Sequence, residues 1–387
     1  MRRRKVMQTT QKWIVADMDK TLMDKKAGTY PTFSESPAFQ PVLQWLKYGG
    51  KLLCVTSDDG HRPFGQFWDN IPASHRKNGQ VLLSTAGGAT LFAGDSEGEV
   101  IEVKSFFEEV KGGLPSPTES TKLATHMVRD FFLDAFDDRS MLKPLASYRR
   151  IAYEKILEKY PSKEKLEKVL TENNMLQRGT LLDRGSLIWR NQAGPVKNWV
   201  KFKDLEKNLN NAIFTNLFIL GLPNSISPPY IEKYAKSFEQ LGIEASAAPN
   251  SVCLSNANID KGTVLRWMNG SDEFDFSYEN CIAMGDNPEG NDYPLTTFRH
   301  VGMPFINCGE KPTEFDTYFL GQYEEGVAKF VQSLNDAIKM NNNNDSSGDD
   351  DNNNNNTAAV DDDTVDLESI FQEDYLKEAL NFSSSKL

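Results

Sequence analysis

Acidic, hydroxyl and lysine side chains stand where short apolar segments of this sequence end. Residues 13–16 form an apolar run typical of a buried strand, and Asp17, Asp19 and Thr21 follow it. If the strand continues to Asp19, both carboxylates project to the same side, because side chains alternate along a strand. Neighbouring anions at the end of a buried strand need a cation, and Mg²⁺ prefers oxygen ligands. An isolated Asp-x-Asp is more often a pair of solvated loop acids, so the later segments must decide.

A second apolar run, residues 51–55, ends in Thr56 and Ser57. The pattern between the two runs predicts a helix over residues 37–48, which Gly49 and Gly50 end. Strand, helix and strand with short connections form a βαβ unit, whose strands are parallel. Thr56 is therefore expected near Asp17, at the edge where open α/β sheets bind ligands. Its hydroxyl could hold a phosphate oxygen or cap the next helix.

Two further segments carry lysine, aspartate or asparagine residues next to predicted helices and strands. Lys261, in Asp260-Lys261-Gly262-Thr263, precedes a predicted helix. The apolar run 281–284 ends in Gly285-Asp286, and Asn291-Asp292 follows shortly after. Each segment is expected to follow or neighbour an element of the same parallel sheet as Asp17.

The region between these segments has a different pattern. Its first half has apolar residues at helical spacing, and strand-like pieces follow at 180–189 and 216–220, with a helix at 229–241. We predict an α/β protein with a doubly wound parallel-sheet core over residues 1–103 and 251–339. An α+β domain, residues 104–250, is inserted into it.

Charge and cysteine usage exclude several classes of protein. The net charge is −12, but residues 340–387 carry −10 of it, so the body is nearly neutral and lacks the basic surface that nucleic acids require. The cysteines Cys54, Cys253, Cys281 and Cys308 are widely spaced and are expected to be reduced core residues. No apolar stretch approaches membrane-spanning length, and no apolar signal core follows the basic start. We expect a cytoplasmic protein without a membrane or nucleic-acid partner.

The C-terminal segment from Met340 consists largely of Asn and Asp runs, which predict disorder. Residues 364–380 form an amphipathic pattern within it. This pattern could dock on a protein partner, dock on the body of the chain, or be a frayed end without function.

Together, the four polar segments resemble the four signatures of the haloacid dehalogenase (HAD) superfamily of phosphotransferases. Asp17-Met18-Asp19-Lys20-Thr21 resembles the first, Thr56 the second and Lys261 the third, and Gly285-Asp286 with Asn291-Asp292 resembles the fourth. The place of the insert is similar to that in the subclass with a type-two α/β cap, which includes Cof-like phosphatases, sucrose-phosphate phosphatase and phosphomannomutase. The resemblance covers about residues 12 to 310. Two departures are Lys20, where the family commonly has Gly, and the Pro-Glu-Gly insertion before Asn291.

The resemblance implies a role for each matching residue. Asp17 would be the nucleophile and Asp19 the general acid and base. Asp17, the main-chain carbonyl of Asp19 and Asp286 would hold Mg²⁺, with Asn291 or Asp292 close to the metal. Thr56 and Lys261 would hold the phosphate oxygens. The weaker candidates for substrate binding are Ser57, Arg178, Arg184 and Arg190.

These roles predict a Mg²⁺-dependent phosphohydrolase that acts on a small phosphorylated metabolite, with a sugar phosphate as the preferred substrate. A phosphomannomutase-like phosphosugar mutase shares every core residue and stays open as an alternative. A non-catalytic HAD-fold binding protein, with the acidic tail recruiting a protein partner, is the rival from another class.

Overall fold

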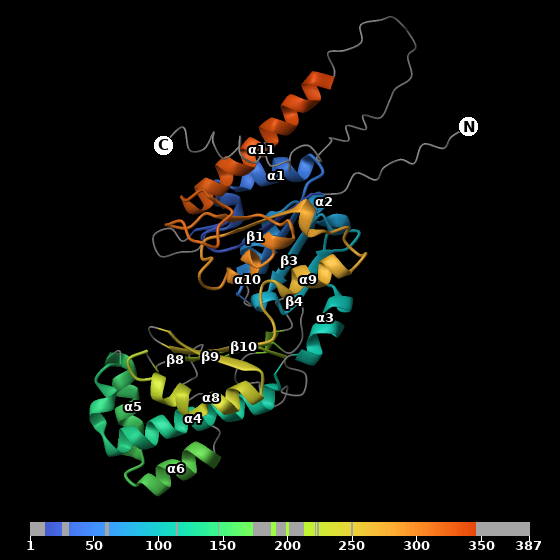
Figure 1. The fold of residues 1–387 in the computed structure, drawn as a ribbon. Helices are drawn as coiled ribbons and strands as arrows, with labels where there is room; N and C mark the ends of the chain where they lie inside the picture. The colour runs from blue at the N-terminus through green and yellow to red at the C-terminus, as the bar shows by residue number, and fades with distance from the viewer. Residues whose placement is uncertain are drawn as a thin grey trace, which may run out of the picture. The chain divides into compact units, whose positions relative to one another are not determined.

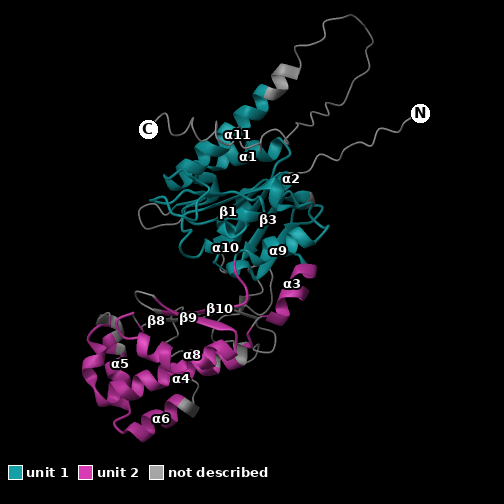
Figure 2. Ribbon diagram, in the orientation of Figure 1, with its two compact units in different colours: residues 1–103, 261–387 teal, residues 104–260 magenta. Residues whose placement is uncertain are grey.

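The structure is a computed structural model. It describes residues 12–24, 31–58, 62–113, 115–145, 147–172, 187–190, 199–200, 213–220, 222, 224–248 and 251–345. The chain divides into two units: unit 1 spans residues 1–103 and 261–387, and unit 2 spans residues 104–260 (Figure 2).

Unit 1 is built on an eight-stranded sheet in the order β13-β12-β11-β1-β2-β3-β4-β5. The strands are β1 Trp13–Asp17, β2 Lys51–Val55, β3 Val81–Thr85, β4 Thr90–Gly94, β5 Val100–Glu102, β11 Cys281–Gly285, β12 Phe305–Asn307 and β13 Tyr318–Phe319. The strands from β13 to β3 pair in parallel, and β4 and β5 continue the sheet antiparallel. All residues of β1, β2 and β11 are buried, as expected for apolar strands covered on both faces.

Helices cover both faces of this sheet. Figure 1 shows α1 (Phe39–Lys47) and α11 (Tyr323–Asp345) on one side, and α9 (Thr263–Gly270) and α10 (Tyr293–Thr296) on the other. The short α2 is Ala73–Arg76. Gly50 follows α1, where a residue with a Cβ would not fit. A Cβ at this position would lie only 2.1 Å from Cε2 of the Trp45 indole. The predicted doubly wound α/β core with a parallel βαβ unit at its start is confirmed.

Unit 2 combines a five-stranded antiparallel sheet with helices. The strand order is β7-β6-β8-β10-β9, with β6 Leu187–Arg190, β7 Trp199–Val200, β8 Ile213–Leu220, β9 Ile243–Ala248 and β10 Ser251–Asn256. The helices are α3 Lys104–Val110, α4 Pro117–Asp137, α5 Ser147–Lys159, α6 Lys163–Glu172 and α8 Pro228–Gln240. Figure 1 shows α4, α5, α6 and α8 gathered on one face of the sheet. Ser116 begins α4 by accepting a hydrogen bond from the Glu119 N–H, and Pro117 occupies the first helical position.

Several elements differ from the sequence prediction. Strand β12 begins only at Phe305, because Arg299–Val301 form a 3₁₀ turn that ends at the left-handed Gly302. The short strands β5 and β13 were not predicted. Helix α11 continues to Asp345, beyond the Met340 at which the tail was expected to begin. The amphipathic segment 364–380 lies outside the described residues.

No helix among the described residues is long and apolar enough to cross a membrane.

Candidate active site

The polar residues meet at the carboxyl edge of the parallel strands. Asp17 is the last residue of β1, Thr56 follows β2, and Asp286 follows β11. The register sets Asp17 beside Val55 and Ala16 beside Met284, so these strand ends lie at the same level. Parallel pairing therefore brings together residues that are far apart in the sequence.

Three carboxylates gather at this edge. One oxygen each of Asp17, Asp286 and Asp292 lies within 4.8 Å of the other two. The turn after β11 returns Asp292 to the site, where its Oδ2 accepts the Asn287 N–H at 3.0 Å. Gly285 makes room for this carboxylate, since a Cβ there would lie 2.5 Å from Asp292 Oδ2. We call Asp17, Asp286 and Asp292 the acidic trio.

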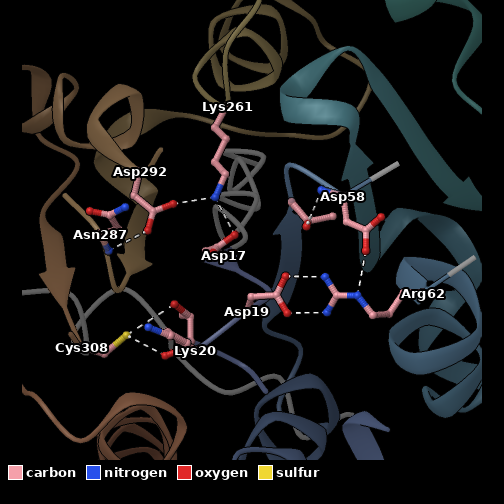
Figure 3. A network of polar contacts seen from close by, with 11 residues as sticks. Asp17, Asp19, Lys20, Asp58, Arg62, Lys261, Asn287, Asp292 and Cys308 are labelled. Atoms are coloured by element: carbon pink, nitrogen blue, oxygen red, sulfur yellow. Dashed lines mark hydrogen bonds and ion pairs between the residues drawn. The ribbon is translucent and has the colours of Figure 1, made fainter. Parts of the chain in front are cut away.

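The Lys261 ammonium bridges two members of the acidic trio. Its Nζ donates to Asp17 Oδ1 and to Asp292 Oδ1, each at 2.6 Å (Figure 3). All three side chains are almost completely buried. Although burial alone would lower the pKa of Lys261, the charges of Asp17 and Asp292 raise it, so the amine stays protonated. One ammonium thus faces three carboxylates.

This excess of negative charge shifts the pKa values of the trio. Burial raises the pKa of the Asp17 carboxyl, and the charge of Asp292 adds to the rise, while Lys261 opposes it. Burial, followed by the Asp292 charge, raises the pKa of Asp286 to about 6, and the Lys20 ammonium partly offsets this rise. A further cation would favour the ionised forms of both side chains.

The acidic trio fits a hard divalent cation. Its donors are carboxylate oxygens, the ligands that Mg²⁺ prefers, and Asp17 and Asp286 carry raised pKa values that such a cation would lower. Softer metals favour thiolate or imidazole ligands, which this trio does not offer.

Asp19 faces a different partner. Strand β1 ends at Asp17, so the extended backbone does not continue to Asp19, and the condition under which both carboxylates would share one strand face is not met. Both Asp19 oxygens instead accept hydrogen bonds from the Arg62 guanidinium, with Nη2 2.5 Å from Oδ2 (Figure 3). Arg62 Nε also donates to Asp58 Oδ2 at 2.7 Å. Such a fork-to-fork contact is geometrically specific.

Arg62 is the site residue that sequence analysis missed. It stands directly before Pro63, in the helical turns that follow the Thr56 segment. Its spacing of four residues from Asp58 is the signal that could have identified it. The chain from Thr56 onward begins at the carboxyl edge of β2, where the site lies.

Thr56 is buried at the same edge. Its Oγ1 accepts the Asp58 N–H at 3.1 Å, and its own N–H donates to the Ser84 carbonyl at 2.9 Å. Ser57 and Asn291 are exposed. Of the two residues considered for the fourth signature, the structure places Asp292 in the cluster and Asn291 outside it.

The cap arginines are placed only in part. Arg190 is the last residue of β6, and its side chain is not described. Arg178 and Arg184 lie outside the described residues. Their role in substrate binding stays a prediction.

Lys20 and Cys308 border the cluster. Lys20 is in the left-handed region with φ 57°, the conformation that explains why glycine suits this position. Burial raises the pKa of the Cys308 thiol, which remains a neutral donor to the Lys20 carbonyl at 3.7 Å and to Thr21 Oγ1 at 3.4 Å. These contacts fix the backbone that follows Asp19.

No family model matches the chain, and no curated protein matches its sequence. Similar solved structures include a sugar phosphatase of HAD subclass IIB, with a TM-score of 0.42, 14% identity, and coverage of 86% of this chain and 99% of that chain. A haloacid dehalogenase-like hydrolase from B. subtilis has a TM-score of 0.42, 14% identity and coverage of 83% and 99%. A trehalose-6-phosphate phosphatase related protein has a TM-score of 0.39, 12% identity and coverage of 85% and 99%. Because these TM-scores are below 0.5, the assignment of the site rests on its own residues and geometry.

Proposed function

We propose that the protein is a Mg²⁺-dependent phosphohydrolase of the HAD type that removes phosphate from a small phosphorylated metabolite. The observation that carries this proposal is the buried Asp17–Lys261–Asp292 bridge beside Asp286. A nucleophile, a fixed ammonium and a set of metal-binding oxygens are the groups that phosphoryl transfer through a carboxylate requires.

Asp17 is the nucleophile in this mechanism. A carboxylate oxygen attacks phosphorus, the bond from phosphorus to the ester oxygen breaks, and an aspartyl-phosphate forms. Water then attacks this phosphorus, releases inorganic phosphate and regenerates Asp17. Its place at the end of β1 holds the attacking oxygen on a rigid element.

Asp19 transfers protons in both half-reactions. It protonates the leaving oxygen first and accepts a proton from the attacking water afterwards, a contribution of roughly 10²–10⁴-fold in rate. Both of its oxygens accept hydrogen bonds from Arg62, so Asp19 must separate from the guanidinium before it can reach the leaving oxygen. Asp58 holds Arg62 Nε when that happens.

The remaining core residues bind and orient. Lys261 and Thr56 hold phosphate oxygens, and Asp292 keeps the Lys261 ammonium in place. Asp17, Asp286 and the main-chain carbonyl of Asp19 would hold Mg²⁺. The ion would offset the charge repulsion between carboxylate and phosphate and stabilise the transferring group.

Unit 2 selects the substrate in this proposal. Its role would be that of a cap, which excludes water from the reaction and binds the leaving group. A sugar phosphate is the preferred substrate class, with Arg178, Arg184 and Arg190 as candidate contacts. Replacing Arg184 with Ala should raise KM for a phosphosugar and leave small generic phosphate esters unaffected.

The test is phosphate release over a panel of phosphorylated metabolites, with and without Mg²⁺. We expect Mg²⁺-dependent turnover of at least one sugar phosphate and none by a folded Asp17→Asn variant. Turnover of the same size by that variant would exclude the covalent mechanism. No turnover of any panel member would favour the binding-protein alternative.

The mutase alternative needs its own assay, because it shares the core residues. A hexose 1-phosphate is supplied with a catalytic amount of the 1,6-bisphosphate. Release of inorganic phosphate faster than formation of hexose 6-phosphate supports hydrolysis, and the reverse order would replace it with mutase chemistry.

A further inference from the structure

Arg62 is shared between two aspartates at the edge of the site (Figure 3). Its Nη1 and Nη2 each donate to one Asp19 oxygen, and its Nε donates to Asp58 Oδ2 at 2.7 Å. The side chains of Arg62, Asp58 and Asp19 are 18%, 24% and 36% exposed, so Asp19 is the most exposed of the three. A planar guanidinium fork matches a carboxylate through two parallel hydrogen bonds, which makes the contact selective for that group.

Asp58 is the fixed partner of Arg62. Its N–H donates to Thr56 Oγ1 at 3.1 Å, and its carbonyl accepts the Ala86 N–H at 3.0 Å. The main chain of Asp58 is therefore tied both to the residue that follows β2 and to the residue that follows β3. Because the Asp58 carboxylate holds Nε, the two Nη groups of Arg62 keep their direction when Asp19 moves.

The proposed reaction requires Asp19 to leave this fork. Both of its oxygens accept hydrogen bonds there, whereas proton transfer needs one of them within hydrogen-bond distance of the leaving oxygen. An aspartate side chain is short and turns between a few rotamers, so the leaving oxygen that Asp19 reaches must lie close to the fork. The leaving group of the substrate therefore lies beside two N–H groups of a partly buried cation, and losing the Asp19 acceptors is costly for that cation.

Resting on the proposed function, we propose that the Arg62 fork binds a carboxylate on the leaving group of the substrate, in the place that Asp19 vacates. The substrate carboxylate replaces the Asp19 oxygens on Nη1 and Nη2, and Asp19 is then free to turn to the leaving oxygen. A neutral hydroxyl does not replace a carboxylate on a guanidinium without loss, so the substrate class is a phosphate ester of a hydroxycarboxylic acid, sugar acids included. Asp58 is a positioning residue, because it acts through Arg62.

The test compares non-hydrolysable phosphonates that differ in one group. 3-Phosphonopropanoate and 4-phosphonobutanoate carry a carboxylate, and the matched 3-hydroxypropyl and 4-hydroxybutyl phosphonates carry a neutral hydroxymethyl group instead. Calorimetry with the full chain and Mg²⁺ gives the Kd of each ligand. Arg62→Gln removes the charge of the fork, and Arg62→Lys keeps the charge without the fork. The matched control is Arg129→Gln, since Arg129 also pairs with an aspartate, Asp130 of unit 2, and is 25% exposed.

We expect the wild type to bind at least one carboxylate ligand about tenfold more tightly than its hydroxymethyl match. Arg62→Gln should abolish this preference, Arg62→Lys should reduce it, and Arg129→Gln should retain it. Asp58→Ala should weaken the preference, whereas Asp58→Asn should keep most of it, because its amide oxygen can still accept from Nε. A merely structural defect would weaken both ligands of a pair alike, so the ratio of their Kd values separates positioning from folding.

Three results would overturn the inference: carboxylate ligands that bind the wild type no more tightly than their matches, a carboxylate preference that persists in Arg62→Gln, or no binding of any of the four phosphonates. Loss of the preference in Arg129→Gln as well would also overturn it, because the effect would then belong to overall charge. In each case the proposed function stands if the metabolite panel shows Mg²⁺-dependent phosphate release. If the panel shows no release, the proposed function fails, and this inference fails with it.

Discussion

Two clusters of charged residues, one around Asp130 in unit 2 and the acidic trio with Lys261 in unit 1, use similar residues in opposite ways. In unit 2, Asp130 of α4 accepts hydrogen bonds from Lys233 Nζ and the Tyr234 hydroxyl at 2.6 Å each, and from Arg129 Nη2 at 3.0 Å. Burial acts to raise the pKa of Asp130, but these hydrogen bonds together lower it. In this cluster, cations and hydrogen-bond donors balance the negative charge of Asp130. The cluster joins α4 to α8.

In the acidic trio of unit 1, the negative charge is not balanced. Asp17, Asp286 and Asp292 share one buried ammonium, and the pKa values of Asp17 and Asp286 are raised. A balanced cluster stabilises the fold, whereas a cluster with excess charge is prepared for a cation and a substrate. The difference shows that charge balance, rather than residue type, separates the structural cluster from the candidate active site.

The largest effect is expected when the acidic trio loses the ammonium of Lys261. Lys261→Met leaves buried carboxylates without a cation, so turnover should fall by about 10³-fold or more, and the free energy of unfolding by roughly 3–5 kcal/mol. The matched control is Lys233→Met in unit 2. Its side chain is 60% exposed, so this change should cost about 1 kcal/mol or less and leave turnover unaffected. Initial rates and urea unfolding measure both effects, and equal losses in the two variants would remove the contrast.

A smaller loss is expected from Asp130→Ala. The change leaves the Tyr234 hydroxyl and Arg129 without their acceptor, which should destabilise unit 2 by about 1–3 kcal/mol. Mg²⁺ affinity, which belongs to unit 1, should not change. Thermal unfolding and Mg²⁺ calorimetry on the same sample check this, and a weaker Mg²⁺ affinity would show that the clusters are coupled.

The pH dependence of stability should reveal the excess charge in unit 1. The pKa of Asp286 is about 6 in the folded chain, above the ordinary aspartate value of 3.8, so folding favours its protonated form. Without Mg²⁺, the contribution of Asp286 to stability is therefore present at low pH and lost as the pH rises through about 6.

Asp286→Asn tests this sign. At pH 7.5 without metal, the variant should melt a few degrees above the wild type, and the difference should vanish near pH 4. Adding Mg²⁺ should reverse the order, because only the wild type keeps the full ligand set. A variant that melts below the wild type at pH 7.5 without metal would mean that Asp286 is already balanced.

The smallest effect is expected from the acidic tail. A chain that ends at Asp345 should keep both its melting temperature and its kcat/KM, because residues 346–387 are too polar to form a core. A large loss of either would indicate that residues 364–380 dock on the body.

Much of unit 1 could be predicted because parallel topology leaves few choices. Apolar runs with a helix between them require parallel strands, and their polar ends must then meet at one edge. The meeting of Asp17, Thr56 and Asp286 follows from that rule. The place of Lys261 does not follow from it, because Lys261 precedes α9 and ends no strand of this sheet. The preference for Asp292 over Asn291 does not, since it depends on the turn that returns Asp292 to Gly285.

Side-chain directions in short loops could not be predicted. Asp19 faces Arg62 because β1 ends early and Lys20 takes a left-handed conformation, which no hydrophobic pattern encodes. Arg62 was missed because the sequence before it has no hydrophobic periodicity from which the direction of its side chain could be predicted. The register of the antiparallel strands in unit 2 likewise depends on packing between strands that are distant in sequence.

Covalent phosphoryl transfer through Asp17 of the acidic trio is the central step of the proposed function. The most direct measurement is an acid quench of the full chain during turnover of a ³²P-labelled substrate with Mg²⁺, followed by mapping of the labelled peptide. We expect acid-stable, hydroxylamine-sensitive label on Asp17 that depends on Mg²⁺ and is absent from Asp17→Asn. Rapid release of labelled phosphate with no labelled protein at any quench time, or label on another residue, would contradict it.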